Sequence, residues 1–291
     1  MTVGRRSAVV IPCFNDGRVL PDALASLEGQ ELCQVVVVDD GSTEDATRRL
    51  LDTLPARGID VIRQSNAGPS AARMAGLAST AAPYVVPLDA DDMISPGAIT
   101  ALADALDADP AAAVAWGDVQ TFGESTIRVR APRRLDPWLL TYINLMPIVA
   151  MYRRDALLSV GGWQLARYED WDLWMTAAEA GWKGVYLDRI VERSRLHGPR
   201  KRRRDFTHHE QTESVLLRRH AALVGQRSAL RHRSPAAWPV KTLLPLVERL
   251  PLAGRNRHRL YNAVCLPTYL VRLKGGQALR QLTTLAKVGD R

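Results

Sequence analysis

The first 116 residues alternate short apolar runs with segments whose apolar residues recur at helical spacing. The runs are bounded by turn residues and cover 8–12, 34–38, 60–63, 84–88 and 112–116. The run Gln34–Val38 (QVVVV) is apolar on both faces, which is typical of a strand buried between two helix layers. Helices are predicted near 20–27, 42–54, 69–77 and 96–106. This alternation predicts a parallel α/β sheet with right-handed crossovers.

The pattern changes after residue 116. Residues 117–167 mix short segments with aromatic residues, and a helix at Asp170–Ala180 and a strand at Gly184–Leu187 follow. Beyond Phe206, helical segments are separated by prolines and by the Gly275–Gly276 pair. We therefore expect an α/β unit in the first 200 residues and a helical region after it.

Charge divides the chain at nearly the same place. Residues 1–192 hold 17 Lys and Arg against 26 Asp and Glu, whereas residues 193–291 hold 22 against 5. The net charge of +8 therefore comes from the last third alone. An acidic N-terminal segment and a basic C-terminal segment suggest two separate roles. The basic segment is expected to bind an anionic partner.

Composition and segment lengths limit the class of protein. With 46% apolar and 24% charged residues, the chain is neither collagen-like nor disordered. Its three cysteines share no CxxC spacing and suggest reduced thiols in a cytoplasmic protein. The first apolar run is too short for a signal peptide. The longest uncharged stretch, Trp138–Tyr152, falls short of the roughly 17–25 residues of a membrane-spanning helix.

Polar clusters follow three of the predicted strands at their carboxyl ends. They are PCFND after the first strand, DDGST after the second and DADD after the fourth. In an open parallel sheet, ligands bind beyond the carboxyl ends of the strands, where the strand order switches. We therefore expect the three clusters to meet in one crevice.

Three common motifs are missing from the sequence. The first strand is followed by PCFND, where a dinucleotide-binding protein would carry G-x-G-x-x-G. The phosphate-binding G-x-x-x-x-G-K-[ST] loop and the G-x-S-x-G nucleophile elbow are also absent. These absences argue against dehydrogenases, P-loop enzymes and α/β-hydrolases.

Asp89-Ala90-Asp91-Asp92 places three carboxylates within four residues at a predicted strand end. Mg²⁺ and Mn²⁺ prefer hard oxygen ligands and often bridge a carboxylate to substrate phosphates. Because Asp89 and Asp91 can face the same way, one can meet the substrate while the other holds the metal. The alternative is a solvated acidic turn that caps the next helix, and the companion motifs favour the metal.

Two further segments allow a functional and a structural interpretation. Asp39-Asp40-Gly41-Ser42 can form a turn and helix N-cap, or present a carboxylate to a base or a ribose. In residues 66–73 (NAGPSAAR), Arg73 falls about one turn into a helix, within reach of an anion in the crevice. Alternatively, it is an exposed surface arginine.

The order and spacing of these motifs resemble the inverting family 2 glycosyltransferases of GT-A fold. The matching stretches are VVIPCFN (9–15), VVVVDDGST (35–43), NAGPSAARMAG (66–76), VPLDADD (86–92), GGW (161–163) and EDWDLW (169–174). The resemblance implies a GT-A catalytic domain over 1–200, with a nucleotide-sugar half to about 116 and an acceptor half from about 117. It does not reach 205–291, so 201–291 is expected only as a helical, basic C-terminal region.

The resemblance also implies roles for individual residues. The nucleotide-sugar site would comprise Pro12, Asn15, Asp40, Asn66, Arg73 and Asp89. The ligands of a Mn²⁺ or Mg²⁺ ion would be Asp91, Asp92 and His197. Asp170 would be the general base, with Glu169 beside it as the second catalytic carboxylate. The family's small and hydroxyl residues after the histidine are replaced here by Pro-Arg-Lys-Arg, so a surface histidine is the alternative for His197.

Sugar transfer requires a carboxylate base and positive charge near the leaving group in any family of enzymes. A sugar hydroxyl is a poor nucleophile until a carboxylate takes its proton in the transition state. The leaving nucleoside diphosphate gains negative charge, which a metal ion and a cation such as Arg73 stabilise. The resemblance to family 2 implies a UDP-sugar as donor, since the position of Asp40 in its motif suits a uracil N–H. The expected acceptor is a hydroxyl of a glycan or of a lipid-linked saccharide, and residues 138–152 are candidates for its wall.

Two other function classes remain as alternatives. A sugar-phosphate nucleotidyltransferase shares the sheet and the metal requirement, but it would carry a Gly-rich loop with Arg or Lys after the first strand. The run Arg200–Arg204 (RKRRR) suggests nucleic-acid binding, against which the acidic first 192 residues argue. We expect no specific nucleic acid as partner.

The basic tail has two interpretations of its own. Segments such as Thr242–Leu250 and Leu260–Val271 combine apolar faces with flanking arginines, as helices on anionic membranes do. This predicts a peripheral protein on the cytoplasmic face of a membrane. The alternative is a helical cap that packs on the sheet and merely exposes its arginines.

Overall fold

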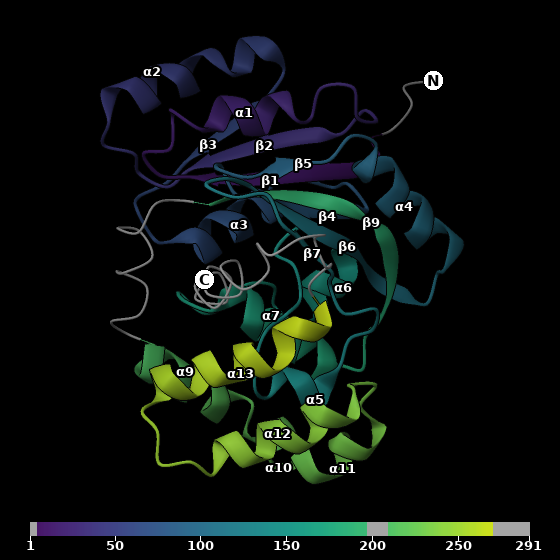
Figure 1. Ribbon diagram of the computed structural model, residues 1–291. Coiled ribbons are helices and arrows are strands. Elements are labelled where there is room, and N and C mark those ends of the chain that lie inside the picture. The colour runs from purple at the N-terminus through teal and green to yellow at the C-terminus, as the bar shows by residue number, and fades with distance from the viewer. Residues whose placement is uncertain (1–4, 197–208, 270–291) are drawn as a thin grey trace.

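The computed structural model describes residues 5–196 and 209–269 (Figure 1). In this part of the chain, nine strands form one mixed sheet of order β3-β2-β1-β4-β8-β6-β9-β5, with β7 paired to β6. The strands are β1 Ser7–Cys13, β2 Gln34–Asp39, β3 Asp60–Arg63, β4 Tyr84–Pro87, β5 Met93–Ile94, β6 Ala112–Gly123, β7 Arg128–Val129, β8 Ala150–Arg153 and β9 Lys183–Leu196. The helices of the first 196 residues are α1 Leu20–Ala25, α2 Asp45–Thr53, the 3-10 turn η1 Pro55–Arg57, α3 Pro69–Ala78, α4 Ala98–Ala108, α5 Pro137–Leu140, α6 Arg154–Ser159 and α7 Glu169–Glu179. Those of the C-terminal region are α9 His209–Arg219, α10 Ala221–Gly225, α11 Arg227–Arg233, α12 Trp238–Glu248 and α13 Gly254–Tyr269.

The first four strands are parallel, as the alternation of apolar runs and helices predicts. β8 runs antiparallel to β4 and to β6, and β9 runs parallel to β6. The mainly parallel α/β sheet with helices on its faces is confirmed. The sequence pattern missed β5, β7 and β8, and it ended the last strand at Leu187 although β9 continues to Leu196. Three of these segments are too short, at two to four residues, for a periodic pattern to show.

Successive residues of the central strands face two different cores, because side chains alternate along a strand. Val9 and Ile11 of β1 pack in one core with residues of α1, α2 and α4. Val10 packs in the other core, where α3 and α7 cover the sheet. Helices cover both faces of β1 and β2 (Figure 1), which explains why these strands are continuously apolar.

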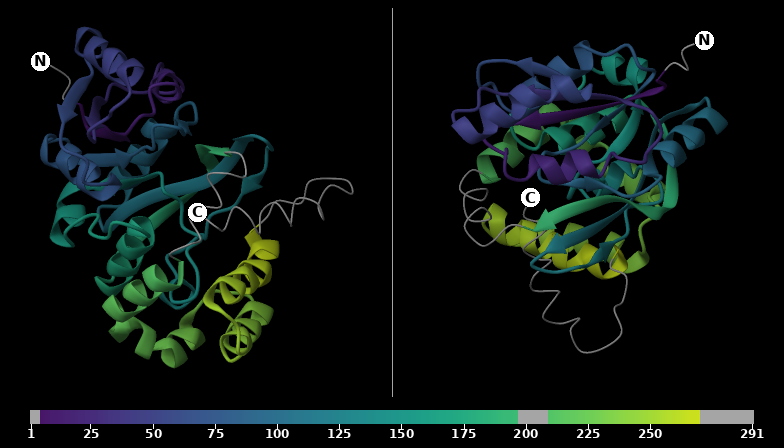
Figure 2. Two further views of the ribbon diagram at one scale, coloured as in Figure 1. Left: turned by 90° about the vertical axis from the view of Figure 1, so that its left-hand side faces the viewer. Right: turned by 90° about the horizontal axis from the view of Figure 1, so that it is seen from above.

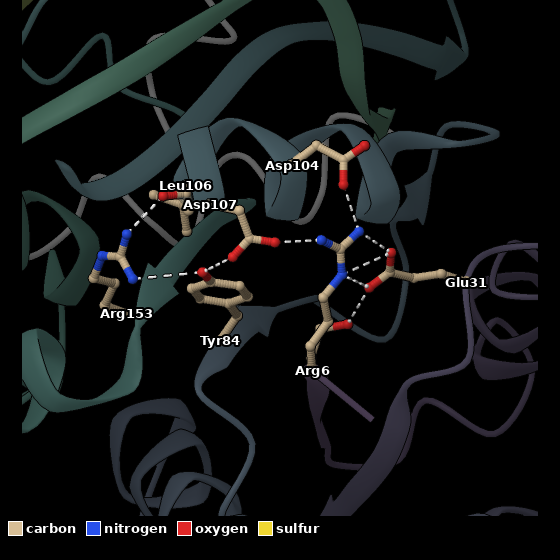
Figure 3. A network of polar contacts seen from close by, with 8 residues as sticks. Arg6, Glu31, Tyr84, Asp104, Leu106, Asp107 and Arg153 are labelled. Carbon is tan, nitrogen blue, oxygen red and sulfur yellow. Dashed lines mark hydrogen bonds and ion pairs between the residues drawn. The ribbon is translucent and has the colours of Figure 1, made fainter. Parts of the chain in front are cut away.

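A polar network holds the amino ends of the central strands (Figure 3). Arg6, just before β1, forms ion pairs with Glu31 at 2.7 Å and with Asp104 of α4 at 2.6 Å. Tyr84, the first residue of β4, hydrogen-bonds to Asp107 of α4. The network thus ties β1 and β4 to α4 at the end of the sheet opposite to the one where the polar clusters lie.

The C-terminal helices pack against the second half of the α/β unit, away from α1 and α2 (Figure 1, Figure 2). Trp138 and Tyr142, at α5, form a third core with Leu244 of α12 and Tyr261 of α13. The C-terminal helices thus pack on the α/β unit through a shared core, as expected for a helical cap. Three features expected from the sequence fall outside the described residues. They are the domain boundary near residue 200, the RKRRR run at 200–204, and Val271 at the end of the expected helical segment Leu260–Val271.

A buried histidine also links the C-terminal helices to α7. His220 places its two ring nitrogens 2.9 Å from carboxylate oxygens of Asp172 and Glu179. Burial acts to lower the pKa of His220, but the hydrogen bonds to both carboxylates raise it above its ordinary value. The imidazolium form is thereby favoured where α7 meets the C-terminal region.

In the described ranges, none of the helices combines the length and the apolar character that crossing a membrane requires.

Candidate active site

A cavity of about 440 Å³ lies beyond the carboxyl ends of β1, β2 and β4. It is lined by Pro12, Cys13, Phe14, Asp16, Asp40, Asn66, Gly68, Pro69, Arg73, Asp89, Ala90, Asp91 and Glu169. The three polar clusters therefore meet in one crevice. Of the predicted nucleotide-sugar residues, all but Asn15 line it.

Arg73 is the central cation of this crevice. Its side chain is only 2% exposed, so the alternative of a surface arginine is wrong. Its Nη2 lies 2.7 Å from Oδ1 of Asp89, and its Nη1 lies 2.9 Å from Oε1 of Glu169. Burial alone would lower the pKa of Arg73, but the charges of Asp170, Asp89 and Glu169 raise it above its ordinary value. The guanidinium stays charged and holds the carboxylates of two segments together.

The close packing of α3 on β1 brings Arg73 to this position. A Cβ on Gly76 would lie 2.2 Å from Cγ1 of Val10, so the helix approaches β1 as closely as only glycine permits. Gly68 precedes α3 at a φ of +90°, a conformation open to glycine, and Pro69 opens the helix. Arg73 then falls one turn into α3, beneath the loop that carries Asp89.

Asp170 lies at the start of α7 beside this ion-pair network. Its Oδ1 is 3.8 Å from Nη1 of Arg73 and accepts a hydrogen bond from Nε1 of Trp163 at 3.3 Å. Burial raises the pKa of Asp170 to about 8; Arg73 opposes this rise, and the charges of Glu169 and Asp89 add to it. A carboxyl group whose pKa is raised in this way accepts a proton more readily than an ordinary one.

Asp89, Asp91 and Asp92 form a group of carboxylates with ligand atoms within 4.8 Å of one another. Hard oxygen donors in this number suit Mg²⁺ or Mn²⁺. Asp92 is buried against β9, where it accepts hydrogen bonds from the backbone N–H of Arg195 at 2.7 Å and from Oγ of Ser194 at 3.1 Å. Burial and the neighbouring carboxylates raise the pKa of Asp92 well above its ordinary range. His197 lies outside the described residues.

Asp40 and Asn15 organise the loops around the cavity. The carboxylate of Asp40 accepts hydrogen bonds from the backbone N–H groups of Ala67 and Gly68, both at 2.8 Å, and from Nε2 of Gln64 at 2.7 Å. The side chain of Asn15 accepts from the backbone N–H groups of Thr43 and Glu44. Asn15 thus holds the start of α2 and does not line the cavity.

A second cavity, of about 310 Å³, opens on the other side of Asp89 and Glu169. It is lined by Asp89, Val119, Thr121, Val129, Asn144, Leu145, Met146, Pro147, Ile148, Tyr168, Glu169, Asp170, Trp171, Glu192, Ser194 and Asn262. Asp170 faces this cavity and does not line the first one. The two cavities therefore meet at Asp89 and Glu169.

The comparisons with known proteins fit this arrangement. Residues 8–167 match Glycosyl transferase family 2, which is more than half of the chain. The chain belongs to glycosyltransferase family 2. It is an enzyme of the transferase class. An uncharacterized glycosyltransferase of Mycobacterium tuberculosis is 30% identical over 197 residues, which are 64% of this chain and 84% of the relative.

Solved structures share the fold of this glycosyltransferase. TarS 1–349 of S. aureus, solved in complex with UDP-GlcNAc, is 14% identical with a TM-score of 0.59, over 98% of this chain and 88% of that solved chain. The mannosyltransferase PcManGT of Pyrobaculum calidifontis, solved with GDP-Man and Mn²⁺, is 17% identical with a TM-score of 0.55, over 99% and 86% of the two chains. The GT-A fold implied by the sequence is thereby confirmed.

Several residues of the second cavity were not predicted from the sequence. Glu192 and Ser194 belong to the part of β9 beyond Leu187, and they alternate with Arg193 and Arg195 on the outer face. This alternation of arginines with other residues over 192–195 is the signal that could have extended the strand. Asn262 comes from α13, and no local pattern connects it to the other residues of this cavity, all of which lie more than 60 residues earlier in the chain.

We expect Arg73→Met to destabilise the glycosyltransferase by about 3–5 kcal/mol at neutral pH, because it leaves buried carboxylates without their cation. The loss should shrink toward about pH 5, where protonation of the carboxyl groups relieves their repulsion. Urea unfolding at several pH values measures both effects. Arg57→Met is the matched control, since Arg57 and its partner Glu28 are about half and three-quarters exposed, and it should change stability by less than about 1 kcal/mol. Equal losses in both variants would contradict the structural role of Arg73.

Proposed function

We propose that this glycosyltransferase transfers a sugar, with inversion and with a divalent metal ion, from a nucleoside-diphosphate sugar to a hydroxyl group. The observation that carries the proposal is the junction of the two cavities at Asp89 and Glu169. The first cavity holds the charged groups that a nucleoside diphosphate needs. The second exposes a carboxyl group of raised pKa, Asp170, next to the place where the donor sugar would lie.

The first cavity suits a UDP-sugar. Asp40 accepts three hydrogen bonds within the protein, and a carboxylate has about four acceptor sites, so one more N–H donor such as that of uracil can bind. Pro12 and Asn66 line the same region. The complexes of TarS with UDP-GlcNAc and of PcManGT with GDP-Man support a nucleotide sugar in this cavity. They do not decide between uracil and guanine as its nucleobase, because the two donors differ there.

The carboxylate group Asp89, Asp91 and Asp92 would hold Mn²⁺ or Mg²⁺. When bound, such an ion supplies positive charge that stabilises the diphosphate as it leaves. Asp91 lines the donor cavity, whereas Asp92 is held from behind by β9. Arg73 already pairs with Asp89, which leaves Asp91 as the carboxylate of the donor cavity that a bound cation would balance.

Asp170 is better suited than Glu169 to act as the general base. Glu169 accepts a hydrogen bond from Arg73 at 2.9 Å, which fixes the position of its carboxylate. Asp170 faces the second cavity, where the acceptor would bind. In the transfer step, a carboxylate oxygen of Asp170 takes the acceptor proton while the acceptor oxygen bonds to the anomeric carbon. The bond from that carbon to the diphosphate oxygen breaks, and both of its electrons leave with the nucleoside diphosphate.

The second cavity indicates an acceptor with polar and apolar faces. Its wall combines Leu145, Met146 and Ile148 with Asn144 and Asn262, and residues 144–148 belong to the segment expected to form the acceptor wall. A saccharide presents C–H faces and hydroxyl edges of this kind. A glycan or lipid-linked hydroxyl therefore remains the proposed acceptor.

We expect Asp170→Asn to lose sugar transfer by on the order of 10²–10⁴-fold while binding the donor normally. Glu169→Gln should lose less. Because the base works only when deprotonated and burial raises the pKa of Asp170 to about 8, kcat/KM of the wild type should rise with pH and level off above about 8. Transfer rates between about pH 6 and 9, with donor affinity measured separately, test this. A larger loss in Glu169→Gln would exchange the two roles.

We expect nucleotide-diphosphate release from one member of a panel of nucleotide sugars, without acceptor and only with Mn²⁺ or Mg²⁺. Thermal melts with Mn²⁺ and UDP should show stabilisation that Asp91→Asn removes. Asp45→Asn, which changes an exposed aspartate at the start of α2, is the control and should keep it. Stabilisation that is unchanged in Asp91→Asn would contradict the metal assignment.

We further propose that the C-terminal region binds the cytoplasmic face of an anionic membrane. Val240, Leu244 and Val247 of α12 are buried in the third core. The outer side of the same segment exposes Trp238 (77%), Leu243, Leu246 and Leu250. The C-terminal helices also expose basic side chains, namely Arg231, Arg233, Arg249, Arg255 and Arg259. Exposed apolar and basic side chains in one helical region suit binding to anionic headgroups.

We expect the whole chain to float with vesicles that contain phosphatidylglycerol, less so in high salt, and not with neutral vesicles. Trp238→Glu with Leu246→Glu should abolish flotation, because both charges would enter the apolar region of the membrane. Leu32→Glu is the matched control, since Leu32 is 65% exposed and precedes β2, far from α12. Equal flotation of the α12 variant would contradict the proposal and leave the helices a structural cap.

A further inference from the structure

Two histidines and a glutamate come together where α9 and α13 meet, outside the two cavities of the active site. They are His209 and Glu213 of α9 and His258 of α13. His209 and His258 are 2% and 6% exposed, which is low for residues with two polar ring nitrogens. Neither is part of the motifs that identify the family, and the proposed function assigns no role to them.

The spacing of these three side chains suits one metal ion. His209 and Glu213 are four residues apart on α9 and therefore share a face of the helix. One ligand atom from each of the three residues lies within 4.8 Å of the others, and Nε2 of His209 is 3.8 Å from Oε2 of Glu213. Two ligands bound at about 2.1 Å to a tetrahedral ion are roughly 3.4 Å apart. Small side-chain adjustments would thus close the site.

The donor set selects a transition metal. Two imidazoles with one carboxylate are a common ligand set for Zn²⁺, whereas Mg²⁺ prefers oxygen ligands and waters. Imidazole binds a metal ion through a ring nitrogen that carries no proton.

Neighbouring residues orient one of the proposed ligands, and a surface cavity gives an ion access to another. The hydroxyl group of Tyr168 hydrogen-bonds to Nδ1 of His209 and so orients the ring, as second partners of metal-binding histidines do. Glu213 also lines a surface cavity of about 710 Å³, together with Glu210, Ser214 and Arg257. An ion can therefore reach the carboxylate from solvent.

We propose that His209, Glu213 and His258 form a binding site for one Zn²⁺-like ion, separate from the metal site of the donor crevice. The ion would join α9 to α13 directly behind the first turn of α7. Tyr168, which contacts His209, precedes the catalytic pair, and the ring of Trp171, which follows that pair, lies 6.2 Å from the ring of His258. Since α13 also carries Asn262 into the second cavity, the site would stabilise the wall of the acceptor cavity.

Cobalt substitution tests the site without any assay of activity. Tag-free protein stripped with EDTA is titrated with Co²⁺, which absorbs visible light strongly when bound in tetrahedral geometry, and Zn²⁺ is then added to compete. We expect one equivalent of Co²⁺ with this absorption, its loss on addition of Zn²⁺, and a melting temperature raised by about 5 °C at a hundredfold excess of Zn²⁺ over Kd.

Variants assign the ion to these residues. His258→Gln and Glu213→Gln should weaken Zn²⁺ binding by on the order of 100-fold or more, whereas Glu210→Gln, the matched change in the same cavity, should not. Asp91→Asn should bind Co²⁺ as the wild type does, because it alters only the donor crevice. If His258→Gln fails to fold, Glu213→Gln decides the question. The side chain of Glu213 is 16% exposed, so its substitution should disturb folding less than that of the buried His258.

Three results would overturn the proposal. They are the absence of tetrahedral cobalt absorption in the wild type, undiminished binding in folded Glu213→Gln, and loss of the absorption in Asp91→Asn. The last result would place the ion in the donor crevice, and it would leave the proposed function intact.

Discussion

The buried guanidinium of Arg73 and the carboxylates around it are the interaction on which the active site depends. A cation at 2% exposure has lost most of its hydration, and this costs several kcal/mol unless anions replace the water. Asp89 comes from the loop after β4 and Glu169 from the start of α7, so the compensation requires these two segments to be adjacent. Arg73 thus joins the half that would hold the nucleotide to the half that would hold the acceptor.

The same interaction gives chemically similar carboxyl groups different environments and therefore different proposed roles. Glu169 and Asp89 accept hydrogen bonds from Arg73 and are fixed by it, whereas Asp170 lies 3.8 Å away and burial raises its pKa. Asp92 is hydrogen-bonded to β9 and does not line the donor cavity, whereas Asp89 and Asp91 of the same motif do. Environment rather than residue type therefore distinguishes the proposed base, the positioning carboxylates and the proposed metal ligands.

The C-terminal helices are part of this arrangement and more than an attachment to it. They share a core with α5, they bind α7 through His220, and they contribute Asn262 to the second cavity. Packing and membrane contact do not exclude each other here, because α12 is apolar on two sides. Val240 and Leu244 face the protein, while Trp238 and Leu246 face solvent. The proposed membrane contact would use this second side.

Local sequence determined most of the first half of the protein. Continuous apolar runs such as Gln34–Val38 indicate strands covered on both faces, and the polar clusters at the strand ends suffice to predict that Asp40, Arg73 and Asp89 share one crevice. The tertiary structure decided what no local pattern encodes. It buried Arg73, paired it with Glu169 96 residues away, raised the pKa of Asp170, and brought Glu192 and Asn262 into the second cavity. The reason is physical: periodicity reports which face of an element is buried, whereas burial energies, ion pairs and pKa values depend on which distant segments meet there.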